Sequence, residues 1–328
     1  MRIALVTPAK PGSRAGNRHT ALRWAAMLRA AGHRVELATA WSGQGNPDLM
    51  VALHARRSHA SIRAFALAHP SRPLVLALTG TDVYRDIHVS PEARESLALA
   101  TRYITLQREA ALELPRRQRA KAHVVVQSSG TRLRRRPVAR TFRACVIGHL
   151  RDEKDPLRAA LALSHLPKSL PIGVVQAGEA LDEAFARKAR ALERGDARYQ
   201  WRGGLAHSRA LALMASSHVL VLSSRMEGGA NVVSEALRIG LPVIASRIPG
   251  NTGLLGRDWP ALYPVGDERA LARLLSRSAT DAAFYARLLR RTAALRAMVA
   301  PDSEARMLLA AVLGQPPRTR RTGAKLRR

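Results

Sequence analysis

The strongest constraint on the fold lies in residues 219–250, which read VLVLSSRMEGGANVVSEALRIGLPVIASRIPG. Residues 219–222 are wholly apolar, as is typical of a strand buried on both faces of a parallel sheet. A polar loop follows, and Asn231 is expected to cap a helix over residues 232–239. Residues 241–245 are the next apolar run. The stretch therefore predicts a strand–loop–helix–strand unit of an α/β fold.

The loop within this unit predicts an anion site. It brings the N–H groups of a new helix to the carboxyl end of a strand, and such groups favour phosphate. Gly228 and Gly229 lack a Cβ, so a phosphate can approach their backbone closely. Glu227 before the helix and Glu235 in its first turn can accept hydrogen bonds from sugar hydroxyls. The pattern suits a sugar nucleotide, although the spacing alone fits equally well a helix-dipole complement and a solvated loop charge.

Glu227 and Glu235 form an E-x7-E signature within S-R-x-E-G-x-x-N-V-x-x-E-A, and G-x-P-V-I-A-S follows. This stretch resembles the donor site of the retaining GT-B glycosyltransferases of the glycogen-synthase-like family (family 4). The resemblance implies an α/β fold of two Rossmann-like, doubly wound parallel-sheet domains that face a cleft. It implies that Glu235 holds the ribose hydroxyls, that Glu227 contacts the sugar, and that backbone amides between them bind the diphosphate. Those intervening donor residues are Gly228, Gly229, Ala230, Asn231 and Val232.

The length and composition fit this architecture. A chain of 328 residues is expected to form two domains, and a hydrophobic content of 47% is sufficient for two cores. The expected division is an N-terminal Rossmann-like acceptor domain over 1–130 and a basic linker over 131–141. A C-terminal Rossmann-like UDP-sugar domain with C-terminal helices is expected over 142–314, and a disordered basic tail over 315–328.

The sequence also bears on location. The longest apolar runs have the length of strands, so no transmembrane segment is expected. Residues 1–6 run directly into Thr7-Pro8 and are too short for the apolar region of a signal peptide. The only cysteine, Cys145, excludes an internal disulfide and a cysteine metal cluster. A cytoplasmic protein is expected.

The net charge of +30 raises the possibility of a nucleic-acid partner. Nearly all of the excess is arginine, in a chain that is also rich in alanine and leucine, which is consistent with a bias toward GC-rich codons. No helix-turn-helix, zinc-ligand or aromatic RNA-binding motif is visible, and aromatic residues make up only 4%. We expect no specific nucleic-acid partner.

The beginning of the chain is Rossmann-like. A strand over 2–7 leads into a loop that contains Gly12 and Gly16, and Asn17 is expected to cap the following helix. The loop lacks the complete dinucleotide fingerprint, so its own signal is weak. The family resemblance places this loop near the donor phosphate and the acceptor.

Two more strands of the first domain end in polar residues. The apolar run 47–53 is followed by Arg56 and Arg57, and ligands of open α/β sheets bind at the carboxyl ends of strands. Guanidinium groups match phosphate geometry, so the pair is a candidate anion site, with ordinary surface charge as the alternative. The run 74–78 is followed by TGTD where relatives often have HGTD. The candidate acceptor residues are Asn17, Arg56, Arg57, Thr79, Gly80, Thr81 and Asp82.

The second domain begins with an expected strand over 142–147. The following segment resembles the family's G-R-L-x-x-x-K motif, whose Arg and Lys neutralise the donor diphosphate. Lys154 matches the lysine, His149 stands at the arginine position, and Arg151 is expected to supply the missing charge. In relatives the loop that corresponds to Gly203 meets the nucleotide base. Glu227, Lys154 and Arg151 are therefore the expected catalytic residues.

Four segments carry a closer resemblance: VTPAKPGSRAGNRHTALRWA, LHARRS, LTGTDVYRD and the donor stretch extended to LLG. They resemble the selenosugar synthases of selenoneine biosynthesis. The resemblance implies a UDP-sugar-dependent hexosyltransferase that joins a UDP-sugar, typically UDP-N-acetylglucosamine, to selenophosphate. Selenium is already anionic near neutral pH, so no strong general base is required. We expect no cofactor and no metal site.

Two other functions fit the sequence. The first is a conventional family 4 glycosyltransferase that acts on a lipid, polysaccharide or small-molecule acceptor; it shares the donor site and differs at the acceptor. The second is a non-enzymatic polyanion-binding protein on the same fold. The sequence leaves the sugar, the anomeric outcome and the oligomeric state open.

Overall fold

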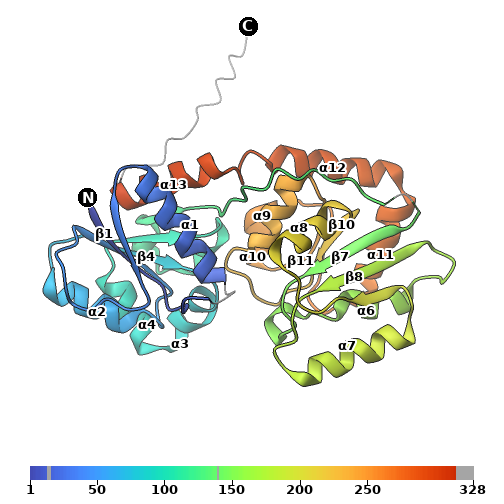
Figure 1. The fold of residues 1–328 in the computed structure, drawn as a ribbon, viewed down its shortest axis with the longest axis horizontal. Coiled ribbons are helices and arrows are strands. Elements are labelled where there is room, and N and C mark those ends of the chain that lie inside the picture. The colour runs from blue at the N-terminus through green and yellow to red at the C-terminus, as the bar shows by residue number, and fades with distance from the viewer. Residues whose placement is uncertain (13–15, 139, 315–328) are drawn as a thin grey trace, which may run out of the picture.

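The computed structural model describes residues 1–12, 16–138 and 140–314, which form two α/β domains side by side (Figure 1). The first contains β1 (Arg2–Val6), α1 (Gly16–Ala30), β2 (Arg34–Ala38), β3 (Leu49–Leu53), α2 (His59–Ala68), β4 (Leu74–Leu78), η1 (Asp82–Asp86), α3 (Ile87–Val89), α4 (Pro91–Leu99), β5 (Arg102–Thr105), η2 (Glu109–Glu113), α5 (Arg116–Arg119) and β6 (Ala122–Val124).

The second domain follows along the chain. It contains β7 (Phe142–Ile147), η3 (Asp152–Lys154), α6 (Arg158–Ala162), η4 (Leu163–His165), β8 (Ile172–Ala177), α7 (Glu183–Gly195), β9 (Tyr199–Trp201), α8 (His207–Ala215), β10 (Val219–Leu222), α9 (Asn231–Ile239), β11 (Val243–Ser246), α10 (Pro249–Leu255), β12 (Leu262–Tyr263), α11 (Glu268–Thr280), α12 (Ala282–Leu295) and α13 (Pro301–Leu313).

Each domain is built on a parallel sheet, as the sequence predicts. The described residues give six strands per sheet, in the orders β2-β1-β3-β4-β5-β6 and β12-β11-β10-β7-β8-β9. The central strands β3 (LMVAL), β4 (LVLAL) and β10 (VLVL) are buried along their whole length, because helices cover both faces of the sheet. The carboxyl ends of the central strands therefore meet at one edge of each sheet, where ligands of such folds bind.

Helix α13 belongs to the predicted second domain by sequence, yet it packs on the first. It lies beside α1 in Figure 1, and Leu308 and Val312 join the core that contains Trp24 and Ile3. The buried Glu304 carboxylate accepts hydrogen bonds from Arg23 Nε (2.7 Å) and Trp24 Nε1 (2.7 Å). The first domain is thus completed by the far end of the described chain.

The described part of the predicted linker, residues 131–138 and 140–141, contains no helix or strand and lies along the second domain. The N–H groups of Arg135 and Arg136 donate to the carbonyls of Ile239 (3.1 Å) and Ala215 (2.7 Å). These bonds hold the linker in place, because each satisfies a backbone donor. The predicted tail, 315–328, lies outside the described residues.

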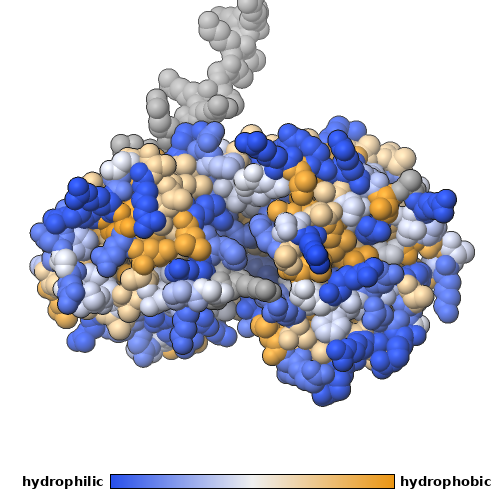
Figure 2. All heavy atoms as spheres, viewed as in Figure 1, coloured by the Kyte–Doolittle hydropathy of each residue, from blue (hydrophilic) through white to orange (hydrophobic). Residues whose placement is uncertain are grey.

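Hydrophilic side chains cover much of the face in Figure 2, and a hollow separates the two domains. None of the helices in the described residues is both long and apolar enough to span a membrane.

Candidate active site

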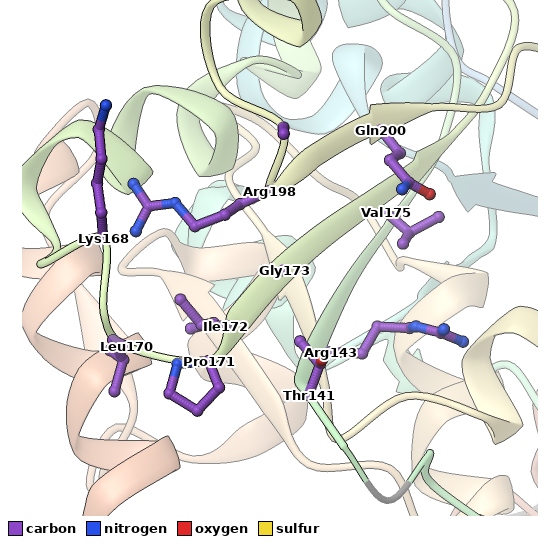
Figure 3. A pocket seen from close by; sticks show the side chains of 11 residues that line it. Thr141, Arg143, Lys168, Leu170, Pro171, Ile172, Gly173, Val175, Arg198 and Gln200 are labelled. Atoms are coloured by element: carbon purple, nitrogen blue, oxygen red, sulfur yellow. The ribbon is translucent and has the colours of Figure 1, made fainter.

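A cavity of about 420 Å³ lies between the domains, and most of the residues that the sequence predicts for the site line it. Its walls come from the loops that follow β3, β4, β7 and β10, at the carboxyl ends of the strands. A second cavity, of about 400 Å³, lies at the amino ends of β7, β8 and β9 (Figure 3). It contains none of the predicted site residues, so the interdomain cleft is the candidate active site.

The donor wall is the loop after β10 and the start of α9. Its lining residues are Gly228, Gly229, Ala230, Asn231 and Val232. Asn231 is the first helical residue and Ala230 occupies the cap position, so the prediction of Asn231 as a capping side chain is wrong. Its Oδ1 instead accepts from Arg23 Nη2 of the first domain (3.4 Å). Because no side chain caps α9 within the described residues, the N–H groups at its start are available to an anion.

Glu227, directly before Gly228, is nearly buried and also lines the cleft on the donor wall. Ser224 Oγ donates a hydrogen bond to its Oε1 (2.6 Å), and Lys154 Nζ donates to the same oxygen. The sequence leads us to expect Lys154 to face solvent, but its side chain is only 22% exposed because of this ion pair. The structure therefore joins the expected donor cation and the expected sugar-binding carboxylate into one unit.

Glu235 also lines the cleft, from the second turn of α9 rather than the first, because the helix begins at Asn231. Its Oε1 lies 2.8 Å from Nε2 of His207, a largely exposed residue at the start of α8. This hydrogen bond raises the pKa of His207 above its ordinary value, against the opposing effect of burial. The Glu235 carboxylate thus faces the cleft, and a ligand in the cleft could take the place of the exposed His207 as its hydrogen-bond partner.

The other donor candidates divide into two groups. His149, Arg151 and Gly16 line the cleft. Gly203 does not; its carbonyl accepts from the N–H of Gly178 (2.7 Å) at the end of the second sheet. Gly12 is also absent from the lining among the described residues and has a positive φ of 79°, which suits a turn.

The acceptor wall belongs to the first domain. Thr79, Gly80 and Thr81 line it, together with Asn17, which is the second residue of α1 and not its predicted cap. Asp82 is fully buried: Oδ1 accepts from the N–H groups of Thr79 (2.9 Å) and Gly80 (2.8 Å), and Oδ2 accepts from that of Ala55 (3.1 Å). The structure therefore makes Asp82 a support of the loop and keeps it out of the cleft.

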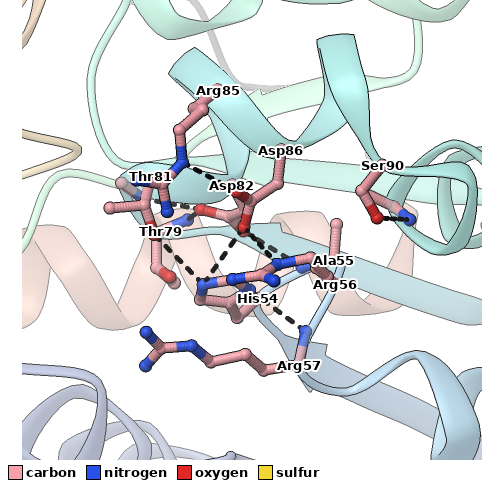
Figure 4. Close-up of polar contacts among 12 residues, drawn as sticks. His54, Ala55, Arg56, Arg57, Thr79, Thr81, Asp82, Arg85, Asp86 and Ser90 are labelled. Atoms are coloured by element: carbon pink, nitrogen blue, oxygen red, sulfur yellow. Dashed lines mark hydrogen bonds and ion pairs between the residues drawn. The ribbon is translucent and has the colours of Figure 1, made fainter.

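The two adjacent arginines have different surroundings (Figure 4). Arg56 Nε donates to Asp86 Oδ2 (3.0 Å), and Arg56 is not among the cleft-lining residues. Arg57 lines the cleft, and its guanidinium points away from the carboxylates and has no partner among the described residues. Burial alone would raise the pKa of Asp86, but hydrogen bonds from Arg85 and Arg56 outweigh it and lower that pKa. One arginine is thus structural, and the other is free to bind an anion.

Sequence reasoning missed several residues of this wall, among them His54 and Arg85. Both line the cleft, and His54 Nε2 lies 3.2 Å from Thr81 Oγ1. The signal for His54 was present, since it directly follows a buried strand and lies two residues before Arg56. No sequence signal pointed to Arg85, because its side chain reaches the cleft only through the helical turn of η1.

The two walls touch each other through glycines. A Cβ on Gly228 would lie 2.2 Å from the carbonyl oxygen of Thr79, and one on Gly229 would lie 2.5 Å from Leu106 Cβ. No side chain fits between them, so these glycines are required by the contact between domains as well as by any approach of phosphate.

Comparison with known proteins agrees with this architecture. HepE from Anabaena, solved with UDP, is 17% identical with a TM-score of 0.77, and the match covers 96% of this chain and 100% of that one. A sucrose-phosphate synthase from Thermosynechococcus elongatus is 16% identical with a TM-score of 0.72 (93% and 96% covered). A glycosyltransferase from Rickettsia africae is 14% identical with a TM-score of 0.71 (97% and 99% covered). The chain has the GT-B fold.

The sequence of the second domain adds the enzyme class. Residues 135–293 match the family model described as glycosyl transferases group 1. The chain therefore combines the GT-B fold with a match to the group 1 glycosyltransferase model over these residues, and the protein is a glycosyltransferase.

Proposed function

We propose that this glycosyltransferase transfers a sugar from a UDP-sugar, UDP-N-acetylglucosamine or a similar donor, to selenophosphate, in selenoneine biosynthesis. The selenium attacks the anomeric carbon, the bond to UDP breaks, and UDP leaves. Water then takes the phosphoryl group from selenium, so that phosphate is released and a 1-selenosugar remains. Within the glycosyltransferases the chain would then be a member of family 4.

The donor wall supports a sugar nucleotide. The uncapped start of α9 suits a diphosphate, and Glu235 is accessible to ribose hydroxyls. HepE, a structural neighbour, has been solved with UDP-glucose. A diphosphate at α9 would compete with Glu227 for Lys154, and Lys154 together with Arg151 would stabilise the negative charge on the leaving UDP.

The proposal of selenophosphate as the acceptor rests on the guanidinium of Arg57, which has no partner among the described residues and lies on the wall that faces the donor loop. No carboxylate of the first domain lines the cleft among the described residues, because Asp82 and Asp86 are buried and engaged. A small anion is therefore favoured over a cationic or uncharged group. Selenophosphate is such an anion, and its ionised selenium does not need the base that a hydroxyl acceptor requires.

The neighbouring arginines provide a matched test of this acceptor site. Arg57→Ala should raise the KM for selenophosphate about tenfold or more, since a charge-assisted contact to the phosphoryl group is lost. Arg56→Ala should change it much less, because Arg56 is bound to Asp86. UDP affinity, measured by calorimetry, should be unchanged in both. Equal kinetics in Arg57→Ala and wild type would move the acceptor site elsewhere.

Product analysis tests the reaction itself. Purified protein with a panel of UDP-sugars and selenophosphate should yield UDP, phosphate and a selenosugar by mass spectrometry. Glycosylation of a hydroxyl acceptor with no selenosugar would instead make the protein a conventional transferase.

Glu235→Ala should weaken UDP binding by about 1.5–3 kcal/mol, because charged hydrogen bonds to ribose are lost. Glu36→Ala, on an exposed strand of the first domain, is the control.

A further inference from the structure

His54 has an unusual backbone conformation. It follows the last residue of β3 with a φ of 77°, in the left-handed region that residues with a Cβ rarely adopt. The ring is buried but still reaches the cleft wall. Strained conformations of this kind occur where the surrounding structure fixes a functional side chain. The surroundings of the ring therefore show what is being fixed.

The hydrogen bonds of the ring define its protonation. The backbone N–H of Arg57 points at His54 Nδ1 (3.3 Å), and because an N–H always donates, Nδ1 is an acceptor. Burial lowers the pKa of His54, which keeps the ring neutral. The single ring proton is therefore on Nε2. Thr81 Oγ1 lies 3.2 Å from Nε2, whereas Asp86 Oδ2 lies 3.9 Å away, too far for a hydrogen bond.

Thr81 consequently accepts from His54 and must direct its own hydroxyl proton elsewhere. Among the described residues the Thr81 hydroxyl has no other hydrogen-bond partner, and Thr81 lines the cleft. The unpaired guanidinium of Arg57 and the side chain of Arg85 line the same wall. A donor hydroxyl on the same wall as these guanidinium groups can bind a phosphoryl oxygen together with them.

We propose that His54 is a positioning residue that acts through Thr81, holding its hydroxyl as a hydrogen-bond donor to an anionic acceptor in the cleft. The inference rests on the proposed function, since it gives that acceptor one further ligand. Arg57 N–H, His54 and Thr81 form a chain of oriented hydrogen bonds that ends at the anion.

The test uses inorganic phosphate as the probe and the UDP-saturated protein. Thr81→Val removes the hydroxyl with little change in shape, Thr81→Ser retains it, and His54→Asn tolerates the left-handed backbone but cannot reach Thr81. Thr81→Val and His54→Asn should each weaken phosphate binding about tenfold or more, and Thr81→Ser should stay near wild type. His59→Asn, outside the cleft, is the control.

The double variant separates positioning from packing. If His54 acts through Thr81, then His54→Asn/Thr81→Val should bind phosphate no more weakly than Thr81→Val alone. The proposal is overturned if the losses of phosphate affinity in the two single variants add up in the double variant. It is also overturned if His54→Asn binds phosphate like the wild type, or if the wild type does not bind phosphate. UDP affinity must be the same in all variants, which excludes misfolding as the cause.

Selenosugar formation by the same samples distinguishes this inference from the proposed function. If phosphate binding follows the expected pattern but no selenosugar forms, the His54–Thr81 assignment stands and selenophosphate is the wrong anion. If wild type and His54→Asn make selenosugar with the same KM for selenophosphate, the proposed function stands and the role of His54 is refuted. A rise in that KM with little change in kcat supports both.

Discussion

Lys154 and Glu227 are paired in the cleft, so a change in one acts on the other. Glu227 is nearly buried, and Lys154 supplies its only charged partner among the described residues. The ion pair is consistent with a lysine that is oriented toward the donor site before the diphosphate binds. Its removal is therefore expected to affect both turnover and stability.

Lys154→Ala should lower kcat by about 10²–10³, comparable to the loss of one charge-stabilising donor. It should also lower the free energy of unfolding by about 1–3 kcal/mol, because Glu227 loses its charged hydrogen bond. Steady-state kinetics and urea unfolding measure the two effects, with the exposed Lys121→Ala as control. Wild-type turnover in the variant would transfer the role to Arg151 or His149.

UDP binding is expected to depend on pH through His207. Its pKa is raised while it donates to Glu235, and ribose hydroxyls that take Glu235 would return it to an ordinary value of about 6.5. Binding then releases a proton, so UDP affinity should fall as the pH drops through the raised pKa and level off below about 6.5. The ring of His19, from the first domain, lies 6.5 Å from the His207 ring between centroids.

Calorimetry of UDP binding in buffers of different ionisation enthalpy measures the released proton directly. His207→Gln should abolish the proton release and flatten the pH profile between the raised pKa and about 6.5. An unchanged profile in this variant would show that Glu235 and His207 stay paired when UDP binds.

Between elements, α10 of the second domain packs against η2 of the first. Glu109 of η2 accepts hydrogen bonds from Thr252 Oγ1 (2.8 Å) and Arg257 Nε (2.7 Å). A Cβ on Gly253 would lie 1.7 Å from Gln107 Oε1. Gly253 does not line the cleft, so its role lies in how closely the domains approach each other.

Gly253→Ala should therefore prevent the closest approach of the two domains. We expect kcat to fall about 10–100-fold, the size of effect that a small misplacement of reacting groups produces, with UDP affinity nearly unchanged. Gly195→Ala is the matched control, because a Cβ there would meet nothing within 4 Å. Small-angle scattering should show a larger radius of gyration for Gly253→Ala only; normal turnover would mean that Gln107 moves aside.

Over the whole molecule, the chain crosses between the domains twice, near residues 128–131 and near 299–301. The two crossings are joined, since the N–H of Ser129 donates to the carbonyl of Val299 (3.1 Å). Glu304 fixes the second crossing by accepting from Arg23, Trp24 and Ser128. Relative motion of the domains must therefore bend both crossings together.

Glu304→Ala should lower the free energy of unfolding by about 3–5 kcal/mol, because Arg23 loses its carboxylate partner and the donors of Trp24 and Ser128 lose their acceptor. Asp302→Ala, an exposed acid in the same turn of α13, is the control. Chemical unfolding of both variants measures the difference. Equal stabilities would mean that water replaces the carboxylate in this network.

The sequence predicted the regular elements well. Strands Phe142–Ile147, Leu74–Leu78 and Val219–Leu222 have the predicted bounds, because long apolar runs between turn residues leave few alternatives. It failed at helix starts: Asn231 and Asn17 favour cap positions, but the backbone begins each helix earlier. It also failed to assign α13 to the first domain, since an amphipathic helix does not encode which sheet it covers.

Within the site, the predicted donor residues from Glu227 to Glu235 all line one cleft, because a single loop and helix start carry the whole pattern. Prediction was poorest for Arg56, Asp82 and His54. Each of the three contacts a group in the segment that follows the neighbouring strand. Arg56 contacts Asp86, Asp82 accepts from the N–H of Ala55, and His54 contacts Thr81. Such pairings arise from the parallel order of β3 and β4, and no spacing along the chain reports them.

The return of α13 also has a consequence for synthesis on the ribosome. The first domain is made before the second, but Leu308, Ala311 and Val312 of its core are made only after the second. Until they emerge, the apolar side chains that α1 and β5 turn toward α13, such as Leu28 and Ile104, lack part of their cover. The nascent first domain is therefore exposed to aggregation for as long as the second domain is being translated. The same late arrival joins the two domains only once both have been made.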